Sequence, residues 1–162
     1  MTILLAVAFL LAQTPLDVAK SVVGKTAIKK LEERMNKRLL EEGRRNQCTF
    51  KTDSDLFDRP CDKKLYNLSV VLINAKRRLD HAGVVNFKFE VSGHTDTTGD
   101  PVHNRELSAR RAAVIVAEMQ KRGMPANEII SVGKGADAPL FKPDDTPVKR
   151  ARNRRYEIRV HL

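Results

Sequence analysis

One acidic and one basic side chain lie where they could share a binding site. Asp96 sits in the glycine-flanked segment 93–99, directly after an alternating apolar stretch that predicts a strand. Arg111 lies in the next helical segment, where Asn104, Leu107 and Arg111 recur at spacing i, i+3 and i+7 and so share one face. A carboxylate accepts from an ammonium and a guanidinium donates to a carboxylate, so the pair could bind a zwitterion such as an amino acid. Spacing alone also allows a structural ion pair between loop and helix, which is the commoner role.

Other reactive residue types lack the partners that their chemistry requires. Ser108 has no legible set of histidine and acid, so nucleophilic catalysis is not predicted. Residues 22–26, VVGKT, end like a phosphate-binding loop, but Ala19 stands where that loop needs glycine. Metal-ligand spacing with the two cysteines is absent at all four histidines, His81, His94, His103 and His161. We therefore expect a binding protein without a cofactor or metal rather than an enzyme.

The elements that would position Asp96 and Arg111 alternate along residues 47–162. Apolar residues at three- and four-residue spacing predict helices, and period-two alternation predicts strands. The expected order is strand, helix, strand, helix, strand, strand over residues 48–51, 61–80, 85–91, 104–122, 129–133 and 155–162. This β-α-β-α-β-β order implies an α/β (α+β) fold, a two-layer sandwich with helices on one face of a mixed sheet.

Two segments precede that domain. The apolar run within residues 1–12 has the length of a secretory signal core and ends at the small residue Ala12, although no Lys or Arg precedes it. A buried N-terminal helix or strand is the alternative. Residues 13–46 interleave acidic and basic side chains around one apolar stripe, which predicts an amphipathic helical linker. The stripe spans fewer than three heptads, so a spacer is favoured over contact with an envelope protein or self-association through residues 15–43.

Size and charge limit the class of protein. A chain of 162 residues, 41% hydrophobic and 31% charged, has room for one folded domain and an appendage. Thirty Lys and Arg against 20 Asp and Glu give a net charge of +10, which leaves a nucleic-acid- or polyanion-binding domain as the alternative function. Aromatic residues make up only 5% and Trp is absent, which argues against a base-stacking surface. The apolar run is shorter than the ~20 residues of a membrane-spanning helix.

Three ordered motifs distinguish between these candidate functions. They are Gly93-His94-Thr95-Asp96 followed by Gly99, residues 104–112 reading NRELSARRA, and Asn153-Arg154-Arg155. In this order and spacing, residues 48–160 resemble the peptidoglycan-binding OmpA-like domain family, of the OmpA C-terminal and Pal type. The resemblance implies a mixed α/β sandwich. It also implies non-covalent binding of peptidoglycan through the diaminopimelate residue of the stem peptide, which would tether the cell envelope to the wall.

The resemblance also implies a role for each matching residue. Asp96 would receive the ammonium of diaminopimelate, and Arg111 would receive its carboxylate. The remaining expected contacts are Leu107 in the pocket wall, Thr95 and Asn104 beside the loop, Arg155 at the rim, and Phe50 on the first strand. Lys51 stands where many family members have Asp. The basic C-terminal stretch would then aid approach to an acidic wall, so no nucleic-acid partner is expected.

Cys48 and Cys61 bear on the cellular compartment. They flank the stretch between the first predicted strand and helix, and they could form a disulfide or remain as two reduced, buried cysteines. The apolar N-terminus and the wall ligand implied by the resemblance both favour the disulfide, which would contribute about 3 kcal/mol by loop entropy. We expect a periplasmic, cell-envelope or outer-membrane-associated protein of a Gram-negative-type bacterium.

Overall fold

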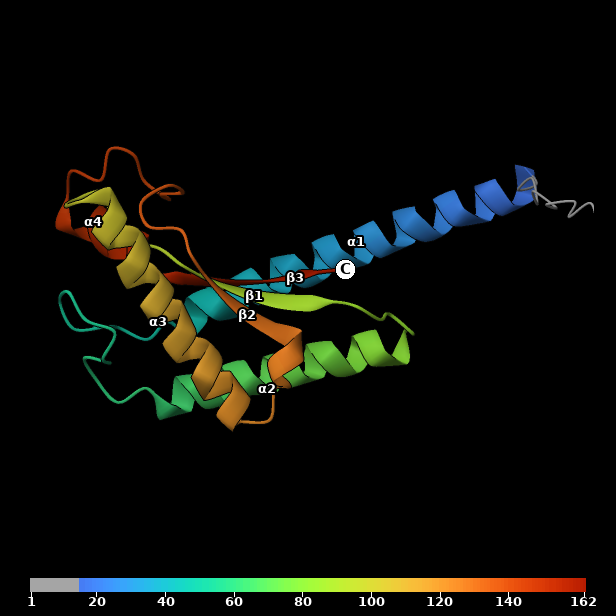
Figure 1. Ribbon diagram of the computed structural model, residues 1–162, viewed down its shortest axis with the longest axis horizontal. Coiled ribbons are helices and arrows are strands. Elements are labelled where there is room, and N and C mark those ends of the chain that lie inside the picture. Colours follow the sequence, from blue (N-terminus) through green and yellow to red (C-terminus); the bar gives the residue numbers. More distant parts are fainter. Residues whose placement is uncertain (1–14) are drawn as a thin grey trace, which may run out of the picture.

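The structure is a computed structural model that describes residues 15–162, so the predicted signal segment at residues 1–12 lies outside the described residues. Within this range the elements follow one another as helices, strands and a single 3-10 turn (Figure 1). In chain order they are α1 (Pro15–Arg45), α2 (Asp62–His81), β1 (Lys88–Gly93), α3 (Pro101–Lys121), η1 (Ala126–Glu128), β2 (Ile129–Gly133), α4 (Pro147–Asn153) and β3 (Tyr156–His161).

The strands form one mixed sheet in the order β2-β1-β3. β1 is parallel to β2, with Phe89 opposite Ile129, and antiparallel to β3, with Phe89 opposite Val160. The parallel pair requires a crossover, and α3 supplies it. The predicted mixed sheet is therefore confirmed, and the central strand β1 is the one that leads into the Asp96 loop.

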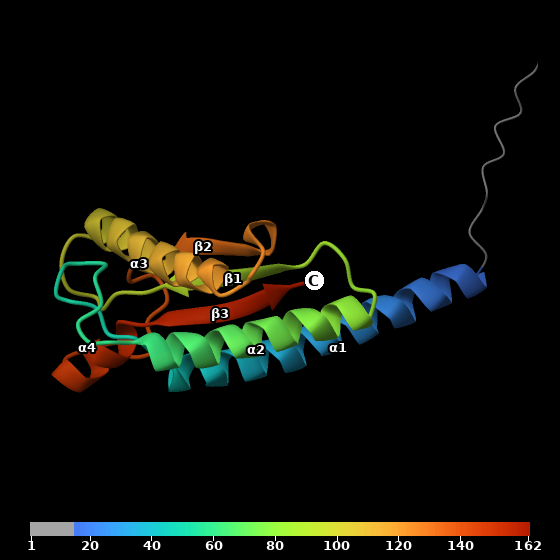
Figure 2. The same cartoon turned by 90° about the horizontal axis from the view of Figure 1, so that it is seen from below.

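The helices α2 and α3 pack on one face of this sheet, as predicted, and α1 runs beside β3 (Figures 1 and 2). Alternate strand residues point into the shared core, and the fully buried ones are Phe89, Val91, Ile158 and Val160. Their neighbours in sequence lie on the opposite face, where Glu90 is partly buried and Arg159 is exposed. The result is a two-layer sandwich whose second sheet face carries charged side chains.

The predicted first strand at residues 48–51 is wrong. Phe50 makes only an isolated bridge with Phe57, and the segment is otherwise a loop. The outer edge of β3 instead faces α1 and Gln47, the second residue after that helix. The Asn36 side chain donates to the Val160 carbonyl (2.9 Å) and accepts from the Val160 N–H (2.7 Å). Gln47 makes the same pair of hydrogen bonds with Tyr156, at 2.7 and 3.1 Å. Each carboxamide supplies one donor and one acceptor, as a strand residue would, so the edge groups of Tyr156 and Val160 are satisfied without a fourth strand.

A short helix before the last strand is missing from the sequence-based order. Helix α4 begins after Thr146, whose hydroxyl accepts from the Lys149 N–H at 3.3 Å, and Pro147 occupies the first helical position. Both are ordinary start signals, but the helix is only seven residues long and lacks a clear apolar period.

Helix α1 has two parts with different surroundings. Its first turns project beyond the sheet (Figure 1), while Leu39 further along is 2% exposed and belongs to the core. Among the described residues, no helix combines the length and the apolar character needed to cross a membrane. The boundaries at residues 12 and 46 stay a prediction.

Candidate ligand-binding site

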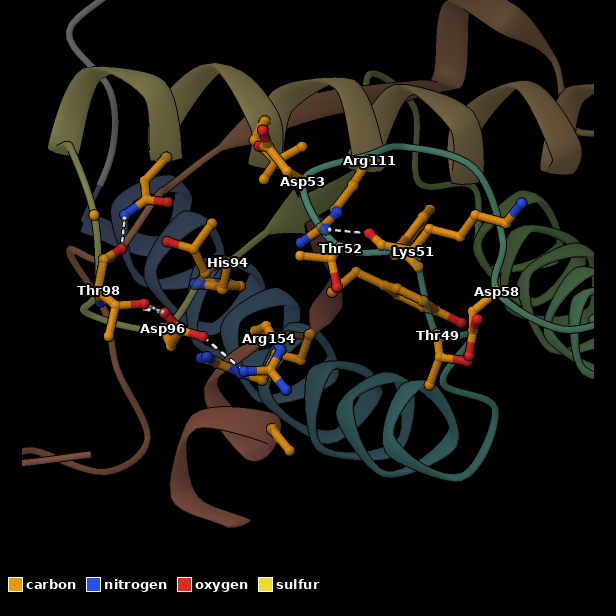
Figure 3. Close-up of a pocket in the computed structure, with 18 of the residues that line it drawn as sticks. Thr49, Lys51, Thr52, Asp53, Asp58, His94, Asp96, Thr98, Arg111 and Arg154 are labelled. Atoms are coloured by element: carbon orange, nitrogen blue, oxygen red, sulfur yellow. Dashed lines mark hydrogen bonds and ion pairs between the residues drawn. The ribbon is translucent and has the colours of Figure 1, made fainter. Parts of the chain in front are cut away.

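A pocket of ≈ 680 Å³ opens where β1 ends. One wall is the loop after β1 with the start of α3, and the facing wall is the loop between Cys48 and Cys61. The junction of α4 and β3, with Arg154, closes a third side (Figure 3). Asp96 and Arg111, the two residues singled out from the sequence, both line this pocket from different elements.

Close backbone packing fixes the loop that carries Asp96. A Cβ at Gly93, the last residue of β1, would lie 2.1 Å from the Ser108 carbonyl oxygen of α3, and one at its register partner Gly133 would lie 2.4 Å from the Arg105 carbonyl oxygen. Only glycine allows α3 to approach the sheet this closely. The loop after Gly93 therefore leaves the strand directly beneath the first turns of α3.

Asp96 is 8% exposed, and its carboxylate already has partners on both oxygens. Oδ1 accepts from the Thr98 N–H at 3.1 Å and from the Thr98 hydroxyl, and Oδ2 accepts from Arg154 Nη1 at 2.7 Å. Burial disfavours the ionised form, but the hydrogen bonds from Thr98 and Arg154 outweigh it and hold the pKa of this carboxyl below its ordinary value. Asp96 is therefore an anion at neutral pH, ready to accept from a cationic group.

A second buried carboxylate holds the same loop from below. Asp144 accepts from the Thr97 N–H at 2.9 Å, from the Thr97 hydroxyl, and from Asn153 Nδ2 at 2.9 Å. These hydrogen bonds, those from Thr97 above all, lower the pKa of Asp144 to about 2. Asn153 also bonds the Leu140 and Phe141 backbone, so the asparagine of the third motif has a structural role.

Arg111 is held by the facing wall. Its Nε donates to the Ser54 carbonyl at 2.9 Å, its Nη2 donates to the Lys51 carbonyl at 3.1 Å, and its guanidinium lies 5.2 Å from the centre of the Phe50 ring. Burial, followed by the nearby Arg154, lowers the pKa of Arg111, which remains cationic at neutral pH. The two carbonyls use two of its five donors and leave others for a ligand.

The predicted disulfide is present between Cys48 and Cys61, with a Cα–Cα distance of 5.9 Å. It closes the loop that contains Phe50, Lys51 and Ser54, the three residues that hold the Arg111 guanidinium. The disulfide therefore bounds one wall of the pocket as well as contributing to stability.

Three further predicted residues also line the pocket. Asn104 donates from Nδ2 to the Thr98 carbonyl at 2.7 Å, which ties α3 to the Asp96 loop, and Leu107 is an apolar wall residue, 5% exposed. The Thr95 hydroxyl is buried without a hydrogen-bond partner. A buried hydroxyl without a partner is costly unless a water satisfies it.

Arg155 lines the pocket, but its guanidinium is committed elsewhere. Its Nε and Nη2 donate to Glu157 Oε1 at 2.9 and 2.7 Å, and its side chain is 8% exposed. Arg154, its neighbour in the same motif, points into the pocket instead (Figure 3). The third motif, residues 153–155, predicted that an arginine lies at the pocket, but it did not tell which of its two arginines faces the pocket. Ligand contact by Arg155 stays a prediction.

His94 also lines the pocket (Figure 3), but its side chain is buried. It is 4% exposed, with Nε2 3.3 Å from the Ser92 hydroxyl and Nδ1 unpaired. Burial, followed by the charge of Arg155, lowers the pKa of His94 to about 4, so the ring is neutral. Across residues 15–162, no three His, Cys, Asp or Glu side chains are grouped as a metal site would require.

Known proteins share this domain. The model of the OmpA family matches residues 50–154. Outer membrane protein A of Bordetella avium is 41% identical over 68 residues, which are 42% of this chain and 34% of that protein. The peptidoglycan-binding protein ArfA of Mycobacterium tuberculosis is 39% identical over 71 residues, or 44% of this chain and 22% of that protein. A 105-residue match to the Photosystem I P700 chlorophyll a apoprotein A2 of Gloeobacter violaceus, at 35% identity, covers 59% of this chain but only 12% of that protein.

Solved structures agree on the fold. The putative MotB-like protein of Desulfovibrio vulgaris superposes with a TM-score of 0.57 at 20% identity, over 84% of this chain and 94% of that one. The peptidoglycan-associated lipoprotein of Burkholderia pseudomallei gives 0.55 at 21% identity, over 72% and 90%.

The chain belongs to the OmpA family. It spans between 12% and 34% of the length of the three curated relatives named above. Outer-membrane and peptidoglycan-binding proteins stand among these relatives, and the predicted membership of the OmpA-like family is confirmed.

Proposed function

We propose that this chain binds peptidoglycan without breaking a bond, through the diaminopimelate residue of the stem peptide. Asp96 receives the free ammonium of diaminopimelate, and Arg111 receives the carboxylate on the same carbon. The observation that carries this proposal is that the two side chains line one pocket and each is held by its own neighbours, not by the other. A merely structural pair would satisfy itself, whereas this one leaves capacity for a zwitterion.

Thr95, Asn104 and Leu107 line the same pocket beside Asp96, which supports a ligand at this place. The walls are fixed by the Asp144 network on one side and by the disulfide on the other, so little ordering is needed on binding. Each stem peptide offers only a few contacts. Retention on the wall then comes from many stems on one polymer, which raises the effective concentration.

The N-terminal segments deliver this domain. In this proposal residues 1–12 direct export or anchor the chain, and residues 13–46 hold the domain at a distance from its anchor. The projecting first turns of α1 support the spacer role. An envelope protein that docks on residues 15–43 remains a proposal. The domain would tether the envelope to the wall from the periplasm.

The test is co-sedimentation with purified sacculi of two kinds, diaminopimelate-type and lysine-type, since lysine keeps the ammonium and lacks the carboxylate. We expect retention on the first kind and little on the second. Arg111→Gln abolishes that difference, while the matched control Arg110→Gln, an exposed neighbour on α3, retains it. Equal retention of the wild type on both kinds of wall contradicts the diaminopimelate assignment.

The same assay separates this proposal from polyanion binding through the net charge of +10. Binding by net charge falls steeply with salt and does not depend on one buried carboxylate. Under the present proposal, Asp96→Asn abolishes retention at every salt concentration, although it makes the protein more basic.

A further inference from the structure

Arg154 lies inside the pocket and is paired with the residue that the ligand must reach. Its Nη1 is 2.7 Å from Asp96 Oδ2, and this is the contact that a ligand ammonium would replace. The Arg154 side chain is 46% exposed, whereas that of Asp96 is 11% exposed. Arg154 is therefore the mobile partner of the pair, and it can move away while Asp96 stays in place.

Next to Asp96, one cation loses its partner once a ligand ammonium has arrived. Arg155 is held by Glu157, and the other charged side chains of the lining lie on the facing loop or at its rim. A zwitterionic group therefore satisfies Asp96 and Arg111 and leaves Arg154 without its partner. A ligand with a second carboxylate gives Arg154 a new partner.

We propose that Arg154 is a specificity-determining residue that binds a second carboxylate of the ligand after the ligand ammonium has displaced it from Asp96. This inference rests on the proposed function and adds to it the class of ligand preferred, a stem-peptide fragment with one free ammonium and two carboxylates in reach. A diaminopimelate residue at the end of a stem tripeptide has this composition. The α-carbon outside the peptide chain bears a free ammonium and a carboxylate. The other α-carbon, whose amino group forms the peptide bond, bears the C-terminal carboxylate.

Two synthetic probes isolate the second carboxylate. One is the stem tripeptide ending in diaminopimelate, and the other is the same tripeptide with its C-terminal carboxylate converted to a carboxamide. Both retain the ammonium and the carboxylate assigned to Asp96 and Arg111. By calorimetry, we expect the wild type to bind the free acid about tenfold more tightly than the amide, the size of one partly exposed charged contact.

In Arg154→Gln, the two probes are expected to bind with about equal affinity. The amide binds at least as tightly as it does to the wild type, because its ammonium no longer has to displace Arg154 from Asp96. Arg152→Gln is the matched control, because Arg152 is exposed on α4, carries the same charge and does not line the pocket. It keeps the tenfold preference. Thermal melting checks that each variant is folded. Because Arg154 is half exposed, its replacement leaves the core intact.

Two results would overturn the inference. If Arg154→Gln keeps the preference for the free acid, Arg154 does not read the second carboxylate. If Arg154→Gln binds both probes more tightly than the wild type, Arg154 only competes for Asp96 and makes no contact with the ligand. If the wild type binds neither probe, the proposed function itself is contradicted. This outcome differs from the two above, which concern Arg154 alone.

Discussion

The two facing walls of the pocket hold their charged residues by different means. On one wall, Asp96 is held by side chains, with Thr98 on one oxygen, Arg154 on the other, and Asp144 fixing the loop from behind. Arg111, on α3, is held from the facing wall by backbone carbonyls of a loop that a disulfide closes. A short motif can therefore specify the Asp96 loop almost completely, whereas the position of the Arg111 guanidinium depends on the path of a loop that is distant in sequence.

The largest expected effect comes from the side-chain wall. Asp96→Asn keeps the shape and the Thr98 contact but removes the charge that accepts the ammonium. We expect a loss of affinity of about 100-fold for the diaminopimelate tripeptide, the upper range for a charged hydrogen bond. Calorimetry measures it, with Asp145→Asn, an exposed carboxylate outside the pocket, as the matched control. A loss smaller than threefold would show that Asp96 does not bind the ligand.

Removal of the disulfide is expected to loosen the loop between Cys48 and Cys61, which forms the facing wall. With Cys48 and Cys61 both replaced by Ala, the loop loses its closure, and we expect the free energy of unfolding to fall by about 3 kcal/mol. At temperatures where the variant is folded, affinity should also fall, by roughly tenfold, because the Lys51 and Ser54 carbonyls no longer fix Arg111. Denaturant unfolding and calorimetry report the two effects separately. Unchanged affinity in the folded variant would mean that Arg111 does not depend on its loop.

The pH dependence distinguishes the two buried groups on the Asp96 side. The pKa of Asp144 is lowered to about 2, so its contribution to stability is complete above the ordinary Asp range and is lost as the pH falls from about 4 towards 2. The pKa of His94 is lowered to about 4, so the unfolded chain takes up a proton first and stability falls between about pH 6.5 and 4.

Urea unfolding across pH 2–8 measures both effects. Asp144→Asn should flatten the curve below pH 4 and leave the upper region unchanged. His94→Gln should flatten the region between pH 4 and 6.5. If His94→Gln leaves that region as steep as in the wild type, His94 is not a buried neutral ring.

The smallest effect is expected from the aromatic contact of the second wall. Phe50→Leu keeps an apolar side chain against Phe57 but removes the ring that lies 5.2 Å from the Arg111 guanidinium. A cation–π contact contributes roughly 0.5–1 kcal/mol at such sites, so affinity should fall about two- to fivefold. A loss as large as that of Asp96→Asn would mean that Phe50 touches the ligand directly.

The sequence predicted the parts of the fold that rest on periodicity. Alternation identified β1 and β3, and three- and four-residue spacing identified α2 and α3. The strand at residues 48–51 was wrong for a physical reason. The side-chain amides of Asn36 and Gln47 bond the edge of β3 at Val160 and Tyr156, and this replacement for a strand has no periodic signature.

The candidate site also has some features that the sequence predicted and others that it could not. The pocket is lined by four of the residues singled out from the sequence, Asp96, Asn104, Leu107 and Arg111, and their contacts with a ligand stay predictions. The choice between Arg154 and Arg155 was beyond sequence reasoning, because it depends on Glu157 pairing with one of two adjacent arginines. The partners of Arg111 were equally beyond it, since backbone carbonyls carry no residue identity.

The most direct test of the central claim is the ratio of dissociation constants for two stem tripeptides, one ending in lysine and one in diaminopimelate. We predict that the wild type binds the diaminopimelate tripeptide at least tenfold more tightly, and that Arg111→Gln reduces this ratio to about one. Equal affinity of the wild type for the two tripeptides, or an unchanged ratio in Arg111→Gln, would contradict the account.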